Sequence, residues 1–210
     1  MLHHKTNVWY EVSNEPFEIH FDNWYYLNYY IEKGSRAICD IMNKNENEIK
    51  KYSCLAVYYH IKVEQLLISI KQINDRFYAK NEKREDLVFN RDSYNYSKSR
   101  FPTLTNSSFR NFIVHIFERN LQHIYDFKAV GGFNYFDSST DVKLRNEYIN
   151  GKFQNIALDL INNNIVIKEK KSNYNPQYLN IELLKNELDD LKKTNDMIGS
   201  YILPKFKKTK

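Results

Sequence analysis

The sequence contains no long hydrophobic run. No apolar stretch approaches the roughly 18 residues that a transmembrane helix needs, and residues 1–10 lack the apolar segment of a secretory signal. Charged residues make up 27% of the chain, and its mean hydropathy is -0.68. This composition argues against a membrane protein, and we expect a cytoplasmic protein with no membrane partner.

Cysteine is also scarce. The 210 residues include two cysteines, Cys39 and Cys54, which show neither Cys-x-x-Cys nor Cys/His ligand spacing. A disulfide framework is therefore not indicated, and both thiols are predicted to be free and buried. His60 and Glu64 are one helical turn apart, but no third ligand accompanies them, so the sequence predicts neither a metal nor a cofactor.

The body of the chain lacks a strong net charge. The formal net charge is +5, but four of these charges are lysines among the last six residues. We interpret residues 205–210 as a basic tail, either a solvated terminus or a weak RNA-binding element formed by Lys205, Lys207 and Lys208. The composition shows no break along the chain, so residues 1–210 are predicted to form a single domain.

Helical patterns dominate the chain. Apolar residues recur at helical spacing in segments that predict four main helices, at residues 17–42, 49–78, 109–127 and 178–202. Gly34 is the weak point of the first helix, and Pro204 is predicted to end the last. Residues 79–105 are polar and predict a long loop. The expected fold class is mainly all-α, a bundle of about four helices.

Residues 133–175 interrupt this helical pattern. Apolar positions between residues 153 and 161 fit one face of a helix. The alternating Ile156, Leu158 and Leu160, followed by three asparagines and a second apolar run at 165–167, fit a β-hairpin instead. Both readings remain open, and the alternation favours a small β-hairpin insertion into the helical domain.

Aromatic residues are abundant. The chain contains 17 tyrosines and 13 phenylalanines, and some form runs such as residues 24–26 and 58–59. Such runs could stack against nucleic-acid bases. Their helical spacing beside leucine and isoleucine favours packing in the core or at a dimer interface instead.

The third predicted helix separates into two faces when it is wound at about 100° per residue. A wide apolar arc contains Phe109, Phe112, Ile113, Val114, Ile116, Phe117, Leu121 and Ile124. A narrow polar strip contains Asn111, His115, Glu118, Arg119 and Gln122. Arg110 lies in the first turn, and its long side chain can swing toward the helix end, where free backbone N–H groups already favour an anion. These residues predict a phosphate pocket.

Arg110 to His115 reads Arg-Asn-x-x-x-His. This segment resembles the Arg-x4-His signature of the HEPN superfamily, and the place of the motif on a late helix, after a long one, resembles that family too. The resemblance implies a helical-bundle homodimer in which two motifs share one cleft. It also implies a metal-independent endoribonuclease that acts as a toxin or in antiviral defence. Residues 133–174 have no counterpart in a minimal member of the family.

The residue types suit this chemistry. An imidazole that titrates near neutrality can deprotonate a 2′-hydroxyl or protonate a leaving oxygen, and a guanidinium can stabilise the charge on phosphate. We expect His115 to act as general base or acid, Arg110 to bind the scissile phosphate, and Asn111 to orient the substrate or His115. Glu118 is expected either to support the site or to form a surface salt bridge.

The leading functional reading is a ribonuclease, with RNA as substrate and an antitoxin or regulatory protein as partner. The second reading is a non-catalytic HEPN-like module that binds RNA, a nucleotide or a partner protein. A helical scaffold that dimerises through aromatic faces is the third alternative. Arg119 and His123 repeat the motif at too short a spacing, so we interpret them as bystanders.

Overall fold

The computed structural model describes residues 7–12, 15–44, 46–77, 99–106, 109, 111, 113, 133–151, 155–168, 173 and 175–206. For residues 7–12, 15–23, 76, 77, 155, 198 and 201–206 it describes the backbone alone. Within these residues the chain is mainly helical with a β insertion, as the sequence predicts. None of the described helices has both the length and the apolar character needed to cross a membrane.

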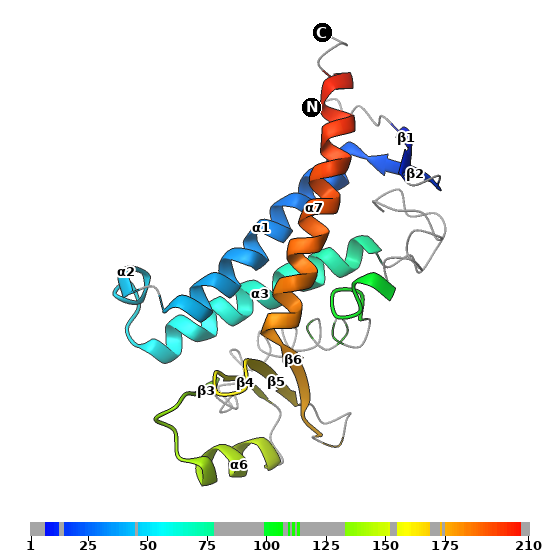
Figure 1. Ribbon diagram of the computed structural model, residues 1–210. Coiled ribbons are helices and arrows are strands. Elements are labelled where there is room, and N and C mark those ends of the chain that lie inside the picture. The colour runs from blue at the N-terminus through cyan, green and yellow to red at the C-terminus, as the bar shows by residue number, and fades with distance from the viewer. Residues whose placement is uncertain are drawn as a thin grey trace, which may run out of the picture.

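Three long helices carry most of the described core. They are α1 (Phe21–Asn43), α3 (Leu55–Phe77) and α7 (Ile181–Phe206), and the short α2 (Glu46–Ile49) lies in the connection from α1 to α3. Figure 1 shows α1 and α3 running back along each other, with α7 crossing them. Each buries an apolar stripe; the largest fully buried side chains include Leu27, Ile31, Ile38, Tyr58, Tyr59 and Leu66.

A glycine on α1 lets α1, α3 and α7 approach one another closely. Gly34 is buried, and a Cβ atom there would lie 3.3 Å from Leu188 Cδ1 and 3.4 Å from the Ser69 Cβ. Ten residues earlier on α1, Trp24 Nε1 donates a 2.9 Å hydrogen bond to the carbonyl oxygen of Asn195. Gly34 is therefore a contact point of α1, α3 and α7 rather than a weak point of the first helix.

A four-stranded sheet lies at one end of the helices. Its strands are β3 (Asn134–Phe136), β4 (Asn155–Asp159), β5 (Asn164–Lys168) and β6 (Gln177–Asn180), in that order across the sheet. β3 and β4 are parallel and are connected through α6 (Val142–Asn150), whereas β4, β5 and β6 pair antiparallel. The hairpin β4–β5 confirms the predicted hairpin, but the insertion also contains β3 and α6, and β6, which follows the insertion, completes the sheet.

The sheet is apolar on both faces because it lies between two layers. Ile156, Leu158, Ile165 and Ile167 join the main helical core, whereas Ala157 and Val166 pack with Phe136 and Ile149 in a smaller core. This alternation follows the two-residue period of a strand. Figure 1 accordingly shows the sheet between the long helices and α6.

The start of the first predicted helix is wrong. Residues 17–20 belong to β2 (Glu15–His20), which pairs antiparallel with β1 (Asn7–Val12), and α1 begins at Phe21. Two features of the sequence explain the difference. Pro16 keeps the residue before it extended, and the apolar residues Phe17 and Ile19 alternate with the polar Glu18 and His20, which is the period of a strand.

The second predicted helix begins too early. Residues 50–54 form a turn, and α3 starts at Leu55 instead of Ile49. Ile49 and Tyr52 still pack against the core, so their apolar character reflects a connection folded onto the helices. Helical spacing therefore predicts the buried positions here but not the boundary.

The last predicted helix differs at both ends. Residues 178–180 belong to β6, and α7 begins at Ile181 after Asn180, whose side-chain oxygen accepts a 2.9 Å hydrogen bond from the Leu183 N–H. Pro204 does not end the helix, which runs to Phe206. Lys205 is thus part of α7 rather than of a basic tail, and Lys207 and Lys208 lie outside the described residues.

Both cysteines are free, as predicted, but the prediction that they are buried is wrong. Cys39 and Cys54 are exposed. Cys39 lies between the buried Ile38 and Ile41 of α1 but points away from the core stripe, and Cys54 lies in the turn before α3. Position on an apolar helix therefore does not by itself bury a small thiol.

Replacing Gly34 by valine should destabilise the fold. The added side chain would meet Leu188 and Ser69 at once, and overpacking of this kind costs about 1–3 kcal/mol. Glu32→Val is the matched control, because Glu32 lies on the exposed face of the same helix. Denaturant unfolding should show a lower midpoint for Gly34→Val than for the control, and equal midpoints would contradict the close packing.

Candidate functional site

The described part of the predicted motif helix consists of Phe109, Asn111 and Ile113, which are helical. Ile113 is buried at 1% exposure, and Phe109 packs against the same core. Asn111, between them in sequence, is exposed. Asn111 therefore lies on the outer side of this helix. Arg110, His115 and Glu118 lie outside the described residues, so their positions stay predictions.

The chain just before the motif is attached to α7. Arg100 Nε and Nη2 donate to the two carboxylate oxygens of Asp190, each at 2.8 Å. The N–H groups of Thr103 and Leu104 donate to the Glu187 carboxylate at 2.9–3.1 Å. Two acidic residues one turn apart on α7 thus hold both a side chain and the backbone of this segment.

The same segment is also buried against the core. Phe101 and Leu104 are 3% and 0% exposed. Asn74 of α3 donates from Nδ2 to the Leu104 carbonyl oxygen at 2.8 Å, and Thr105 Oγ1 donates to the Phe101 carbonyl oxygen at 2.7 Å. Residues 101–105 are therefore a compact, buried turn, whereas the sequence predicted the end of a long loop. Residues 79–98 of that loop lie outside the described residues.

The charges of this anchor are mutually stabilising. The hydrogen bond from Arg100 lowers the pKa of the Asp190 carboxyl below its usual value, against a smaller opposing effect of burial. The Arg100–Asp190 pair is partly exposed, at 36% and 40%, so solvent screens it. Glu187 is half-buried and accepts hydrogen bonds from two backbone N–H groups, so we regard it as the stronger anchor.

His60 packs against an aromatic ring. Its ring stacks on Phe133 with centroids 4.9 Å apart and an interplanar angle of 14°, and Nε2 lies 3.3 Å from Glu64 Oε1. Within the described ranges, no three histidine, cysteine or acidic side chains are grouped so as to hold a metal ion. His20, another histidine in an aromatic segment, lies in β2 rather than in a helix.

The tyrosines of the two aromatic runs differ in burial. Tyr58 and Tyr59 are fully buried, which confirms the packing prediction for them. Burial also raises the pKa of Tyr59 to about 12. Tyr25 and Tyr26 instead remain 57% and 50% exposed, so they do not pack in the core.

The insertion holds a buried charged group that the sequence analysis missed. Asp159 is fully buried at the end of β4, where Arg145 of α6 and Asn162 donate hydrogen bonds to its carboxylate. Burial raises the pKa of Asp159, but these hydrogen bonds outweigh burial and leave the pKa below its usual value. An acidic residue at the end of an apolar strand, just before an asparagine-rich turn, was the signal available in the sequence.

Lys168 is a second buried charge in the insertion. Its Nζ donates to the carbonyl oxygens of Tyr148 and Ile149 at 2.9 Å and also to that of Gly151. These carbonyls belong to the C-terminal end of α6, where a cation is favourable. Burial lowers the pKa of Lys168. We interpret both Asp159 and Lys168 as structural, because each connects α6 to the sheet.

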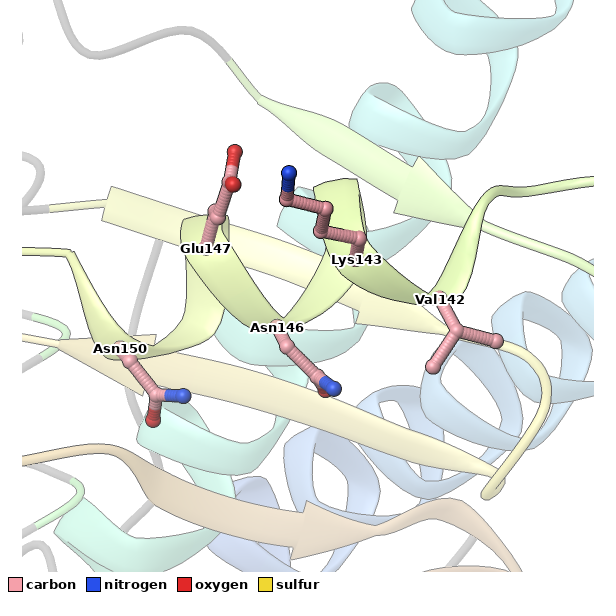
Figure 2. Close-up of a pocket in the computed structure, with 5 residues that line it drawn as sticks. All are labelled: Val142, Lys143, Asn146, Glu147 and Asn150. Atoms are coloured by element: carbon pink, nitrogen blue, oxygen red, sulfur yellow. The ribbon is translucent and has the colours of Figure 1, made fainter.

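A shallow hollow on α6 does not form a candidate active site. Its lining consists of Val142, Lys143, Asn146, Glu147 and Asn150. Figure 2 shows that Lys143 and Glu147 leave the helix to one side and the other three residues to the opposite side. The side chains therefore do not converge on one point, and they include no histidine or cysteine.

Removing the Glu187 carboxylate should release the segment before the motif. In Glu187→Ala the Thr103 and Leu104 N–H groups lose a charged acceptor, a loss of about 1.5–3 kcal/mol. Their amide hydrogens should therefore exchange about tenfold faster or more. Asp189→Ala, on the exposed side of the same helix, should leave this exchange unchanged. Equal protection in both variants would argue against Glu187 as the anchor.

The ion pair of Asp159 should give the fold a defined pH dependence. Because its folded-state pKa lies below the unfolded value, the carboxylate contributes stability above about pH 4 and loses that contribution as the pH falls through the lowered pKa. Asp159→Asn should therefore be less stable than wild type at pH 7, by about 3 kcal/mol, with the gap narrowing below pH 4. Thermal unfolding from pH 3 to 7 measures this, with the exposed Asp196→Asn as control.

Comparison of the chain with protein-family models, curated proteins and solved structures finds no match. The resemblance to the HEPN superfamily therefore depends on the sequence alone, that is, on the motif and on its place on a late predicted helix. The structure adds two observations near that motif: Asn111, its second residue, is exposed, and the segment of residues 99–106 before it is attached to α7.

Proposed function

We propose that this protein is a metal-independent endoribonuclease of HEPN type, with Arg110, Asn111 and His115 as its site. The observation that carries the proposal is the orientation of the motif helix. Ile113 lies in the core while Asn111 is exposed, so the helix presents to solvent the side on which the sequence predicts the polar strip. A substrate can reach a residue on that side.

Helical spacing extends this argument along the motif. Residues four positions apart share one face of a helix. If the helix continues as its pattern predicts, His115 shares the face of Asn111, and Glu118 follows almost one turn later. In the sequence Arg110 directly precedes Asn111 and comes four residues after the segment of residues 99–106, which Glu187 and Asp190 hold on α7.

The proposed reaction requires no metal. One imidazole takes the proton from a 2′-hydroxyl, and the 2′-oxygen forms a bond to phosphorus. The bond from phosphorus to the 5′-oxygen breaks, and an imidazolium protonates that oxygen as it leaves. The products are a 2′,3′-cyclic phosphate end and a 5′-hydroxyl end. Arg110 stabilises the negative charge that develops on the phosphoryl oxygens.

A homodimer supplies both the base and the acid. Two His115 side chains in one cleft can take these two roles, and two Arg110 side chains double the positive charge around the phosphate. An active ribonuclease would degrade the RNA of the cell that makes it unless it is inhibited. We therefore further propose a role as a toxin or antiviral effector with an antitoxin or regulatory partner. These elements follow from the family resemblance.

The deciding experiment is cleavage of total cellular RNA by the purified protein in EDTA. Wild type should produce fragments with cyclic-phosphate ends, whereas Arg110→Ala and His115→Ala should each lower the rate at least about 100-fold. Asn111→Ala should lower it less. The natural controls are Arg119→Ala and His123→Ala, which repeat the residue types at the wrong spacing and should retain activity.

Several results would contradict the proposal. A wild-type protein that is folded and dimeric but leaves RNA intact would favour the non-catalytic module. Activity that requires a divalent cation, or that survives the loss of both Arg110 and His115, would assign cleavage to other groups.

A further inference from the structure

The outer face of α1 exposes a group of aromatic and basic residues that the proposed chemistry does not use. Tyr25, Tyr26 and Tyr29 are 57%, 50% and 45% exposed. Lys33 and Arg36 continue this face toward the C-terminal end of the helix and are also exposed. We call these five residues the α1 tyrosine face. Three large aromatic side chains within five residues of one surface helix are a costly exposure unless they bind something.

The rings lie close together. Tyr25 and Tyr26 meet edge to face, with centroids 5.9 Å apart at 76°, and Tyr29 meets Tyr30 in the same way, at 5.2 Å and 80°. Tyr25 and Tyr29 are one turn apart, so their exposed side chains are placed to receive successive planar groups. Lys33 Nζ lies over the Tyr29 ring, 5.4 Å from its centroid, which places a positive charge on one face of this ring.

The charge of the face favours an anionic ligand. Neither Lys33 nor Arg36 forms an ion pair within the described residues, although Glu32 lies beside them. Asp40, farther along α1, is held by Lys62 of α3 at 2.7 Å. Among the side chains of α1 that the structure describes, the α1 tyrosine face therefore offers two cations next to exposed rings, with Glu32 as the neighbouring carboxylate.

We propose that the α1 tyrosine face binds single-stranded RNA. Bases stack on Tyr25 and Tyr29 while Lys33 and Arg36 contact the backbone phosphates, a combination typical of sequence-independent single-strand binding. The choice of RNA over other single-stranded nucleic acid rests on the proposed function. The binding itself needs neither Arg110 nor His115, so the two proposals can fail separately.

A second copy of the chain fits this face less well. A two-fold contact would bring the same patch of both copies into one interface, which would then hold Lys33 and Arg36 twice. Among the described side chains of α1, each copy would bring one neighbouring carboxylate, that of Glu32, against two cations. RNA instead brings a phosphate for each cation and a flat base for each ring.

The test is fluorescence anisotropy with a labelled 20-nucleotide single-stranded RNA in EDTA, using the His115→Ala protein so that the RNA stays intact. Tyr25→Ser with Tyr29→Ser should raise Kd about 25-fold or more, because the loss of each stacked base raises Kd about fivefold at the least. The paired Tyr→Phe changes should retain affinity, because the ring remains. Tyr178→Ser is the matched control, since Tyr178 is a 50% exposed tyrosine in β6.

The contribution of the two cations is measured separately, through the salt dependence of RNA binding. Lys33→Gln with Arg36→Gln should lower the slope of log Kd against log salt by about 0.7 for each charge removed. Unchanged affinity in the double serine variant, or an equal loss in the Tyr178→Ser control, would overturn the proposal. So would a double serine variant that becomes monomeric while its RNA affinity stays the same, because the face would then be an interface between copies.

Cleavage measured alongside binding distinguishes the two proposals. Tyrosine-dependent binding without cleavage by wild type would remove the ribonuclease and leave the RNA-binding face. Cleavage that depends on Arg110 but is indifferent to Tyr25 and Tyr29, with unchanged binding, would leave the ribonuclease and remove this face.

Discussion

The close approach of α1, α3 and α7 at Gly34 is the constraint on which the rest of the described structure depends. A hydrogen in place of a side chain lets Leu188 of α7 and Ser69 of α3 lie against the α1 backbone. Helix α7 is thereby fixed beside the other two, and its Glu187, the residue before Leu188, reaches the segment that leads into the motif. Core packing and the position of the candidate site are thus set by neighbouring residues of one helix.

The sequence was informative where a periodic pattern ran for several turns. It predicted the three long helices, the buried Tyr58 and Tyr59, and the hairpin of residues 155–168, because burial imposes a period of 3.6 or 2 on apolar residues. The prediction was wrong at the ends of helices and strands, where the identity of a few residues sets the boundary. Residues 17–20 alternate apolar and polar with the period of a strand, but four residues were too few to outweigh the helical pattern that follows them. Residues 178–180 pair with β5, and nothing in so short a segment distinguishes a strand from the start of the helix.

The surroundings of the candidate site were not predictable for a related reason. Arg100 and Asp190 are 90 positions apart, and nothing local to either residue indicates that they meet. Glu187 reads as an ordinary polar residue on the outer side of an amphipathic helix, although it binds two backbone N–H groups. Asp159 and Lys168 were missed similarly, since charged residues are expected at the surface and these are buried by partners distant in sequence.

The attachment of residues 99–106 to α7 also has a consequence for the order in which the protein matures. A ribosome makes the motif segment well before it makes Glu187 and Asp190, and synthesis proceeds at about 5–20 residues per second. During that interval the turn of Phe101 to Thr105 has no carboxylates to hold it. A nascent chain therefore carries the motif before the carboxylates that hold the preceding segment have been made, so this part of the fold can be completed only after α7 has been synthesised.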